Sequence, residues 1–465
     1  MRTILGIAAL AAAACTAQAA PWKMSVAPPA PRARVQDIQY NQTVHWFDGA
    51  ILDHFNMTDR RTWSQRYFVI DDFWSPPHGP VILHICGEYT CPGIMPARLT
   101  PLVMAQKYKA LVVSVEHRFF GESMPLPGLT TEHLAFHNSR QAISDLAWFS
   151  QWFQDTHINA AHGLPTGTRN KWVAVGGSYP GALAAWYRLK FPALTVGSHS
   201  SSGVVEAILE FTDFDKQVGT TAGPTCAAAL RNITAQLEAR WPAVAADFHA
   251  QELSVAGDFF YFMADAAAEA MQYAHRDVLC DALNAVWTAV GDPYPAWVSY
   301  VNGYFVRVLG NSPADYNWET LANPSTGGNG RSWWWQKCTE LAYWQVAPAQ
   351  GAIRSAWVNT SYHEELCAKV FGLHELPAVQ ETNNYYGGTD VAVDNVFFFN
   401  GGADPWQWAG VRSTLGPTRP AYLVDCVNGT CAHCQDLYTP AANDPPPLVQ
   451  ERKALFLEYQ AWLGA

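Results

Sequence analysis

A serine that lies between a short apolar run and a segment of helical period is the clearest chemical feature of this sequence. Gly176-Gly177-Ser178 follows the apolar residues 172–175 and precedes a segment with apolar residues at helical spacing. Such a run is typical of a buried parallel strand, so we expect a strand that turns sharply into a helix at Ser178. The small neighbours permit a strained turn, and the helix N-terminus favours developing negative charge. We therefore predict that Ser178 is a nucleophile; the alternative is a glycine turn in which the serine only caps the helix.

The residues around Ser178 are typical of the nucleophile elbow of α/β-hydrolases, with one departure. The usual pattern G-x-S-x-G has its second glycine two residues after the serine, whereas this chain has Pro180 there and Gly181 one residue later. Proline is tolerated in the first turn of a helix, because its missing N–H would have no partner there. The departure is therefore compatible with an elbow.

A histidine that can accept the serine proton is found by its position. In α/β-hydrolases the order along the chain is Ser, then Asp or Glu, then His, and the acid holds the imidazole in the required tautomer. Of the 15 histidines, only His433 lies in the C-terminal region where strand-like runs return. Cys426, Cys431, His433 and Cys434 also resemble a zinc ligand set. In a secreted chain those cysteines are expected to form a disulfide instead, so we predict His433 as the base and no metal.

The third catalytic residue should follow a strand that lies between the serine and the histidine in sequence. Asp404 comes shortly after the apolar run 396–400 and satisfies this requirement, whereas Asp394 precedes the run and would lie at the wrong end of the sheet. Asp425 ends the next strand-like run and is the alternative. Since ligands bind at the carboxyl ends of parallel strands, we predict Asp404.

An oxyanion hole needs two backbone N–H groups that point at the developing negative charge. We expect one from Tyr179, the residue after the nucleophile, and one from the loop that follows an earlier strand and contains Gly87 and Glu88. Glycine in that loop would let the backbone approach the substrate. The Glu88 side chain has two interpretations: it binds a substrate amine, or it pairs with Arg98 or Arg118.

The whole chain is predicted to have an α/β-hydrolase fold with an inserted helical cap domain. Apolar runs alternate with helical segments in residues 20–211, which indicates a mostly parallel sheet covered by helices. Alanine-rich helical segments dominate residues 212–385, where we expect no buried strand, and strand character returns in residues 386–465. The expected strands are 67–70, 81–85, 110–115, 172–175, 396–400 and 421–424, and the expected helices are 139–155, 226–241, 245–255, 259–274 and 448–463.

The N-terminal residues and the composition indicate the secretory pathway. Residues 1–19 have a positive start, a short apolar core and an A-x-A site, as in a signal peptide, although a lipoprotein site at Cys15 is a weak alternative. No later apolar run is long enough to span a membrane, and the net charge of −11 offers no basic stripe for nucleic acid. We expect a secreted, lysosomal or vacuolar glycoprotein with N-x-S/T sites at Asn41, Asn56, Asn232, Asn359 and Asn428.

The cysteine count is odd once the predicted signal peptide is removed. Nine cysteines then remain, and in an oxidising compartment most should be paired, which leaves one unpaired. Sequence alone does not determine the pairing. We expect Cys226 with Cys280 and Cys338 with Cys367.

Six segments of this sequence together form a recognisable signature. They are Leu52-Asp53-His54-Phe55, Gln65-Arg66-Tyr67-Phe68, Glu116-His117-Arg118-Phe119-Phe120-Gly121-Glu122-Ser123, Gly176-Gly177-Ser178-Tyr179, Cys338-Thr339-Glu340 and Asn400-Gly401-Gly402-Ala403-Asp404-Pro405-Trp406. From about residue 45 to the C-terminus the chain resembles the serine peptidase family of lysosomal Pro-Xaa carboxypeptidase and dipeptidyl peptidase II. Further segments, such as SYPGALAAWYRLKFP and AHCQDL, are most similar to its thymus-specific serine protease branch.

The resemblance implies a serine exopeptidase that acts on peptides, without a cofactor, through Ser178, Asp404 and His433. It places Trp406 and Glu340 at the substrate pocket, together with Ala182, where relatives have a methionine that lines a proline pocket. We therefore expect a pocket that accepts larger side chains as well as proline. Residues 116–118 match the family too, but we expect them to form a buried charged network beside the elbow.

Two other function classes share this fold, because fold alone does not determine function. A lipase or esterase would have a cap with a continuous apolar face, whereas this cap also carries Arg331, Lys337 and Glu340. A binding module without activity is disfavoured by the complete set of candidate catalytic residues. The direction of cleavage is left open, and so is the oligomeric state, with a homodimer as one option.

Overall fold

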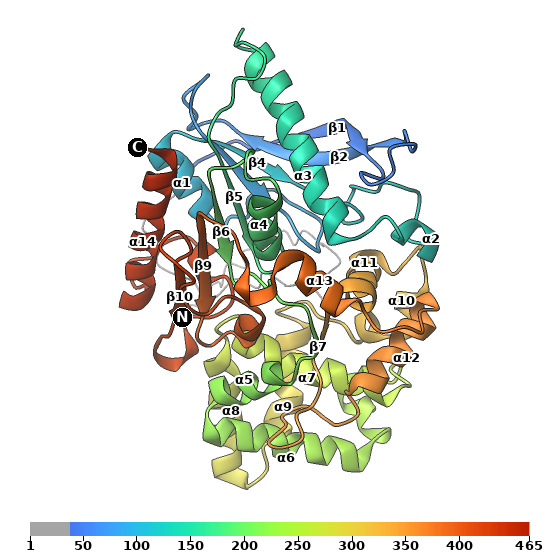
Figure 1. The fold of residues 1–465 in the computed structure, drawn as a ribbon. Helices are drawn as coiled ribbons and strands as arrows, with labels where there is room; N and C mark the ends of the chain where they lie inside the picture. The colour runs from blue at the N-terminus through green and yellow to red at the C-terminus, as the bar shows by residue number, and fades with distance from the viewer. Residues whose placement is uncertain (1–37, 465) are drawn as a thin grey trace, which may run out of the picture.

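The computed structural model of this protein describes residues 38–464. The predicted signal peptide, residues 1–19, lies outside the described residues. Figure 1 shows a central sheet with helices on both sides and a largely helical region below the sheet.

One sheet of eight strands organises the described chain. The strand order is β1-β2-β4-β3-β5-β6-β9-β10. The pairs β1–β2 and β2–β4 are antiparallel, and every later pair, from β4–β3 to β9–β10, is parallel. This is the α/β-hydrolase fold that the sequence predicts. The strands are β1 Thr43–Ile51, β2 Thr62–Ile70, β3 Val81–Ile85, β4 Leu111–Val115, β5 Trp172–Gly177, β6 Gly197–Ser201, β9 Val396–Gly401 and β10 Ala421–Val424.

Helices cover both faces of the sheet, and central strands such as β3 and β4 are buried and mainly apolar on both faces for that reason. In β3, Val81 and Leu83 pack in the same apolar cluster as α3 and α4, whereas Ile82 packs in a second cluster with α1 and α14. Figure 1 shows these two helix pairs on opposite sides of the sheet. The four helices are α1 Thr100–Tyr108, α3 Ser139–Phe153, α4 Tyr179–Lys190 and α14 Pro446–Leu463, and a short helix, α2 Thr131–Leu134, precedes α3.

Almost two hundred residues separate β6 from β9 along the chain, although these strands are neighbours in the sheet. The intervening segment leaves the sheet at its carboxyl edge, forms the lower half of the molecule in Figure 1, and then returns. Its main helices are α5 Thr212–Ala222, α6 Pro224–Arg240, α7 Ala256–Gln272, α8 Arg276–Val290, α9 Tyr294–Tyr300, α10 Trp318–Ala322, α11 Gly328–Gln336, α12 Thr360–Phe371 and α13 Val379–Tyr386. We refer to this segment as the cap. The boundaries predicted for it, 212 and 385, stay a prediction.

Some expected elements differ from the structure. Residues 245–255 are not an α-helix: a 3₁₀-helix, Ala243–Phe248, ends at His249, whose φ of +54° breaks the helical path. The cap region also contains a buried strand that was not expected. This strand, β8 Ala342–Trp344, pairs in parallel with β7 Ile208–Glu210 outside the main sheet.

Residues 38–464 contain four disulfides, among them both predicted pairs, Cys226–Cys280 and Cys338–Cys367. The other two disulfides, Cys86–Cys91 and Cys426–Cys431, each close a short loop at the carboxyl edge of the sheet. Cys434 is buried and free, which accounts for the odd cysteine.

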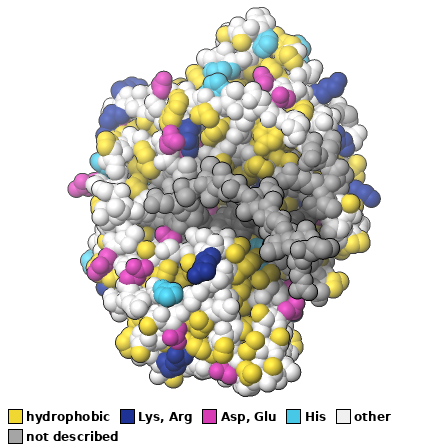
Figure 2. Space-filling view, turned by 180° about the vertical axis from the view of Figure 1, so that it is seen from behind, with side chains coloured by type: hydrophobic (Ala, Val, Ile, Leu, Met, Phe, Trp, Pro, Cys, Tyr) yellow, Lys and Arg dark blue, Asp and Glu magenta, His cyan; other side chains and the backbone are white. Residues whose placement is uncertain are grey.

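The described surface is mixed in charge. On the face shown in Figure 2, basic side chains are scattered among acidic ones rather than gathered in a stripe. None of the helices within residues 38–464 is both long and apolar enough to cross a membrane. Four of the five predicted glycosylation sites, Asn41, Asn56, Asn232 and Asn359, are solvent-exposed, and the side chain of Asn428 lies outside the described set.

Candidate active site

Ser178 lies at the junction of β5 and α4, in the strained conformation that an elbow requires. Its φ is +69° and its ψ is −128°, a region that side chains other than glycine rarely adopt. The backbone is held on both sides, because Ser178 N donates to Ser201 O at 2.8 Å and Ala182 N donates to Ser178 O at 3.0 Å. The serine hydroxyl therefore stands at the helix N-terminus rather than along the strand.

The small residues around Ser178 are required by close packing. A Cβ at Gly176 would lie 2.2 Å from Pro180 O, and a Cβ at Gly181 would lie 2.8 Å from Ser201 O. Gly181 thus lets α4 approach β6, one position later than in the usual elbow pattern. A Cβ at Gly87 would lie 2.5 Å from Pro180 Cγ, so the loop after β3 packs directly against the elbow.

His433 and Asp404 come together at the carboxyl ends of neighbouring strands. His433 Nδ1 lies 2.6 Å from Asp404 Oδ2, and both side chains are buried. Asp404 Oδ1 accepts a hydrogen bond from Trp406 N at 2.9 Å, which fixes the carboxylate. The alternative acid, Asp425, is solvent-exposed, and no contact with His433 is found for it among the described residues. The geometry favours Asp404.

Ser178 and His433 line the same cavity. Ser178 Oγ and His433 Nε2 are both buried, and neither has a hydrogen-bond partner within the described chain. Burial lowers the pKa of His433, but attraction and hydrogen bonding to Asp404 and Cys434 together outweigh burial and raise it. This arrangement leaves one imidazole nitrogen available for proton transfer and stabilises the imidazolium that would form.

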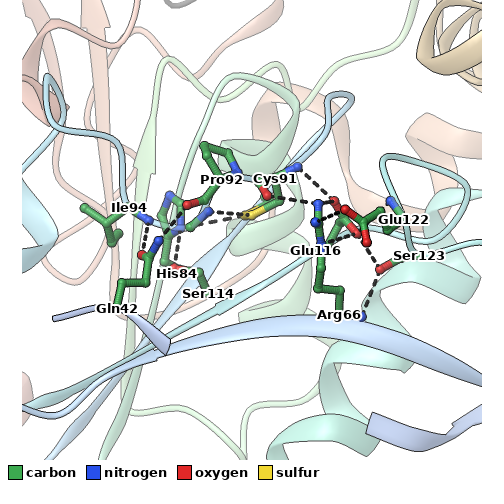
Figure 3. The surroundings of a disulfide bond; sticks show 12 residues. Gln42, Arg66, His84, Cys91, Pro92, Ile94, Ser114, Glu116, Glu122 and Ser123 are labelled. Carbon is green, nitrogen blue, oxygen red and sulfur yellow. Dashed lines mark hydrogen bonds and ion pairs between the residues drawn. A yellow bond between two sulfur atoms is a disulfide. The ribbon is translucent and has the colours of Figure 1, made fainter. Parts of the chain in front are cut away.

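The loop that carries Gly87 and Glu88 is fixed by a buried ion pair (Figure 3). The Cys86–Cys91 disulfide closes this loop, and Cys91 N donates to Glu116 Oε1 at 2.9 Å. Arg66 in β2 forms an ion pair with the same carboxylate at 2.5 Å. A buried charge needs such partners to be tolerated, so Glu116 is structural, as the sequence predicted.

Arg118 is also structural and is not a partner of Glu88. Arg118 Nε lies 2.6 Å from Asp145 Oδ2 in α3, and His54 Nε2 lies 2.7 Å from Asp145 Oδ1. Although burial opposes it, the Arg118 guanidinium holds the pKa of Asp145 below its ordinary value. The predicted alternative in which Glu88 pairs with Arg118 is therefore wrong.

The side chain of Tyr179 is held by the cap, which sequence reasoning did not anticipate. Its hydroxyl accepts from Gln336 Nε2 at 2.7 Å and lies 3.1 Å from His117 Nε2. Glu340 is linked to Tyr179 only through Gln336. Its carboxylate accepts from Ser139 N at 2.9 Å and from Gln336 Nε2 at 2.9 Å. Glu340 does not line the cavity that contains Ser178.

Trp406 belongs to an aromatic cluster between the cap and the sheet. Its ring centroid lies 5.6 Å from that of Tyr343 in β8 and 5.1 Å from that of Phe214 in α5. Gln272, at the end of α7, accepts from Trp406 Nε1 at 3.0 Å through its side chain and from His433 N at 2.9 Å through its backbone. Gln272 was missed because an amide at a helix end carries no sequence signal.

Ala182, the third predicted pocket residue, is fully buried in the first turn of α4. It does not line the cavity that contains Ser178.

Metal binding by the histidine loop is not supported. Cys426 and Cys431 form a disulfide, so neither thiol is available as a ligand. Within residues 38–464 no group of three or more His, Cys, Asp or Glu side chains is arranged to hold a metal ion.

The sequence matches the family model described as serine carboxypeptidase S28 over residues 50–259 and 264–455. The "Probable serine protease EDA2" of Arabidopsis thaliana is 41% identical over 84% of this chain and 80% of its own length. The "Thymus-specific serine protease" of Homo sapiens is 30% identical over 90% of this chain and 86% of its own. The "Lysosomal Pro-X carboxypeptidase" of Bos taurus is 28% identical over 89% and 86%.

Proposed function

The chain belongs to the serine carboxypeptidase S28 family, and from this premise we propose that Ser178, His433 and Asp404 form its catalytic triad. The protein is a serine-type peptidase. The observation that carries the triad is the shared cavity, in which Ser178 Oγ and His433 Nε2 are both unpartnered while His433 Nδ1 faces Asp404.

The proposed reaction proceeds through an acyl-enzyme. Ser178 Oγ attacks the scissile carbonyl carbon as its proton passes to His433 Nε2, and Asp404 stabilises the imidazolium. The same proton then passes to the leaving amine, the C–N bond breaks, and an ester to Ser178 remains. A water molecule, deprotonated by His433, hydrolyses the ester and restores the serine.

The oxyanion of the tetrahedral intermediate is bound by backbone N–H groups in this proposal. Tyr179 supplies one, at the first position of α4, and the loop of Gly87 and Glu88 supplies the other. The packing of Gly87 on Pro180 supports this arrangement, because it brings the loop next to the elbow. Two fixed donors cost no reorganisation during the reaction.

Substrates in this proposal are short peptides cleaved near one end, with access limited by the cap. Trp406, like Ala182 and Glu340, does not line the cavity that contains Ser178, and its pocket role stays a prediction. In this proposal its aromatic neighbours form an apolar wall suited to proline or a larger side chain. The pocket roles of Ala182 and Glu340 stay predictions, and in this proposal Glu340 acts through Gln336 rather than by direct contact. Four disulfides and the lysosomal relative support maturation in the secretory pathway and residence outside the cell or in a lysosome.

A fluorophosphonate probe, which modifies activated serines, tests the proposal. We expect one labelled residue, Ser178, and faster hydrolysis of peptides than of fatty-acid esters of matched size. Labelling at another serine would overturn the nucleophile. A preference for esters would favour the esterase alternative.

A further inference from the structure

Glu88 is a buried carboxylate without a partner. Its side chain is 1% exposed, and neither carboxylate oxygen has a hydrogen bond within residues 38–464. Buried polar groups are nearly always paired, so an exception calls for an explanation. Burial raises the pKa of Glu88 to about 7, against an ordinary value of 4.5, because the charged form is poorly solvated there. The Glu88 carboxylate therefore lacks a cation or hydrogen-bond donors that would stabilise its charge.

The cations near Glu88 do not supply what is missing. Arg118 is committed to Asp145. Arg98 lies 5.0 Å over the ring of Tyr438 and is hydrogen-bonded to that residue. His433 and, less strongly, Arg98 lower the pKa of Glu88 by attraction, but within the described chain no ion pair joins either of them to Glu88. Apart from a contact with its own backbone, which lowers its pKa, Glu88 thus keeps its hydrogen-bonding capacity for a ligand.

The unpaired carboxylate shares a cavity with the reacting groups. Glu88, Ser178 and His433 line one cavity, and Gly87, the residue before Glu88, packs on the elbow. A peptide whose scissile carbonyl lies at Ser178 Oγ would place its adjacent residues within reach of Glu88. A free α-ammonium brings a positive charge and three donors, as a lysine side chain does, but every peptide with a free N-terminus has one whatever its sequence.

We propose that Glu88 binds the free α-ammonium group of the substrate, so that this peptidase cleaves near the N-terminus. The proposal rests on the proposed function, since it assumes that Ser178 attacks the peptide bond. Because Glu88 and Ser178 line the same cavity, the residues between the α-ammonium and the scissile bond must fit within that cavity. The opposite direction would require Arg98, which lines the same cavity, to bind an α-carboxylate. Of the Arg98 nitrogens, only Nε is buried without a partner among the described residues, and the guanidinium lies over the Tyr438 ring and is hydrogen-bonded to that residue, whereas both Glu88 oxygens lack partners.

The test uses one peptide in three forms: with free ends, with an acetylated N-terminus, and with an amidated C-terminus. We expect acetylation to lower kcat/KM by roughly 10- to 100-fold, the loss typical of a hydrogen bond to a charged group, and amidation to change it little. Glu88→Gln should remove this discrimination while it preserves shape. Glu365→Gln is the matched control, because Glu365 is an exposed carboxylate of the cap.

A binding measurement keeps the proposal testable without turnover. Calorimetry with Ser178→Ala should show tighter binding of the free-amine peptide than of its acetylated form, and Glu88→Gln in that background should abolish the difference. Equal binding of the two forms, or discrimination that survives Glu88→Gln, would overturn the proposal. If hydrolysis depends on Ser178 but has the same rate for free and acetylated N-termini, the proposal for Glu88 fails and the proposed function stands. If the fluorophosphonate does not label the protein, the proposed function itself is rejected.

Discussion

Gln336 Nε2, at the end of cap helix α11, donates a hydrogen bond to the Tyr179 hydroxyl at 2.7 Å. Tyr179 directly follows the nucleophile and is the proposed source of an oxyanion-hole N–H. His117, after β4, approaches the same hydroxyl from the sheet at 3.1 Å. The cap and the sheet therefore meet on the residue that directly follows Ser178.

Replacing Gln336 with alanine should reduce kcat more than it raises KM. The variant leaves the buried Tyr179 hydroxyl with one partner fewer, which costs about 1 kcal/mol in a typical case, and it loosens the first turn of α4. Steady-state kinetics and thermal unfolding measure the two effects. Gln380→Ala, on the exposed face of α13, is the control. Equal kinetics for both variants would show that the contact with Tyr179 has no catalytic role.

Ser178→Ala should abolish turnover and leave the fold intact. In subtilisin, loss of the nucleophile costs about 10⁶-fold in kcat, and alanine fits a site that selects small residues. Circular dichroism and melting temperature should match those of the parent. Ser413→Ala, at an exposed position, should retain activity; more than a few per cent of activity in Ser178→Ala would identify a different nucleophile.

The two candidate acids give a matched pair of variants. Asp404→Asn should lower kcat by about 10⁴-fold, because an amide facing His433 Nδ1 favours the wrong tautomer. Asp425→Asn should have little effect, since that side chain is solvent-exposed. The reverse ranking in kcat would move the catalytic acid to Asp425.

Much of the sheet could be predicted from the sequence because parallel strands buried on both faces are continuous apolar runs. Strand β6, Gly-Ser-His-Ser-Ser, lacks that signal and was missed. Its polar side chains are paired instead: His199 Nε2 lies 2.6 Å from Asp436, and Ser200 Oγ donates to Gly181 O at 2.8 Å. Edge strand β1 was missed for a different reason. It exposes Val44 and Trp46, which obscures the usual alternation.

The candidate triad was accessible to sequence reasoning because each member follows a strand at one edge of the sheet. The supporting residues were not accessible, since tertiary contacts alone select them. Gln272 and Gln336 come from helix ends of the cap, and nothing in their local sequence distinguishes them from surface amides. The unpaired state of Glu88 likewise depends on where Arg98 and Arg118 find their partners.

The Cys426–Cys431 disulfide should support activity more than stability. It precedes His433 in the same loop, and Ala403 N donates to Cys431 O at 3.0 Å, which ties this loop to Asp404. With a separation of 5 residues, loop-closure entropy predicts a loss of only about 2 kcal/mol on removal. We expect the double serine variant to lose kcat disproportionately.

The cap disulfide Cys226–Cys280 provides the comparison. Its separation of 54 residues predicts a larger loss of stability, about 4 kcal/mol, with near-normal kcat in the fraction that remains folded. Urea unfolding and kcat measured for both variants separate the two roles. Inactivation by EDTA that zinc reverses would contradict the disulfide interpretation of the histidine loop.

The pH dependence of kcat/KM should depend on whether the substrate has a free N-terminus. Below about pH 7 the Glu88 carboxyl of the free enzyme is largely protonated and neutral, so it cannot offer a full charge to an ammonium. As the pH rises through about 7, the carboxylate forms and kcat/KM for free-amine peptides should rise. Above about 8 the α-amino group itself loses its proton, and the advantage should fall again. The acetylated peptide should show neither change.

Other titrating groups near Glu88 must be separated from it. The groups that interact with it or share its cavity are Arg98 before α1, His84 in β3, Tyr89 in the same loop, His433 in the histidine loop, Tyr179 in α4 and Tyr343 in β8. Burial lowers the pKa of His84 to about 4, which places its titration below the relevant range. Profiles of Glu88→Gln on both peptides identify the source: the rise specific to the free amine should disappear, and any rise common to both peptides comes from a group other than Glu88. A free-amine profile unchanged by Glu88→Gln would show that a different group controls it.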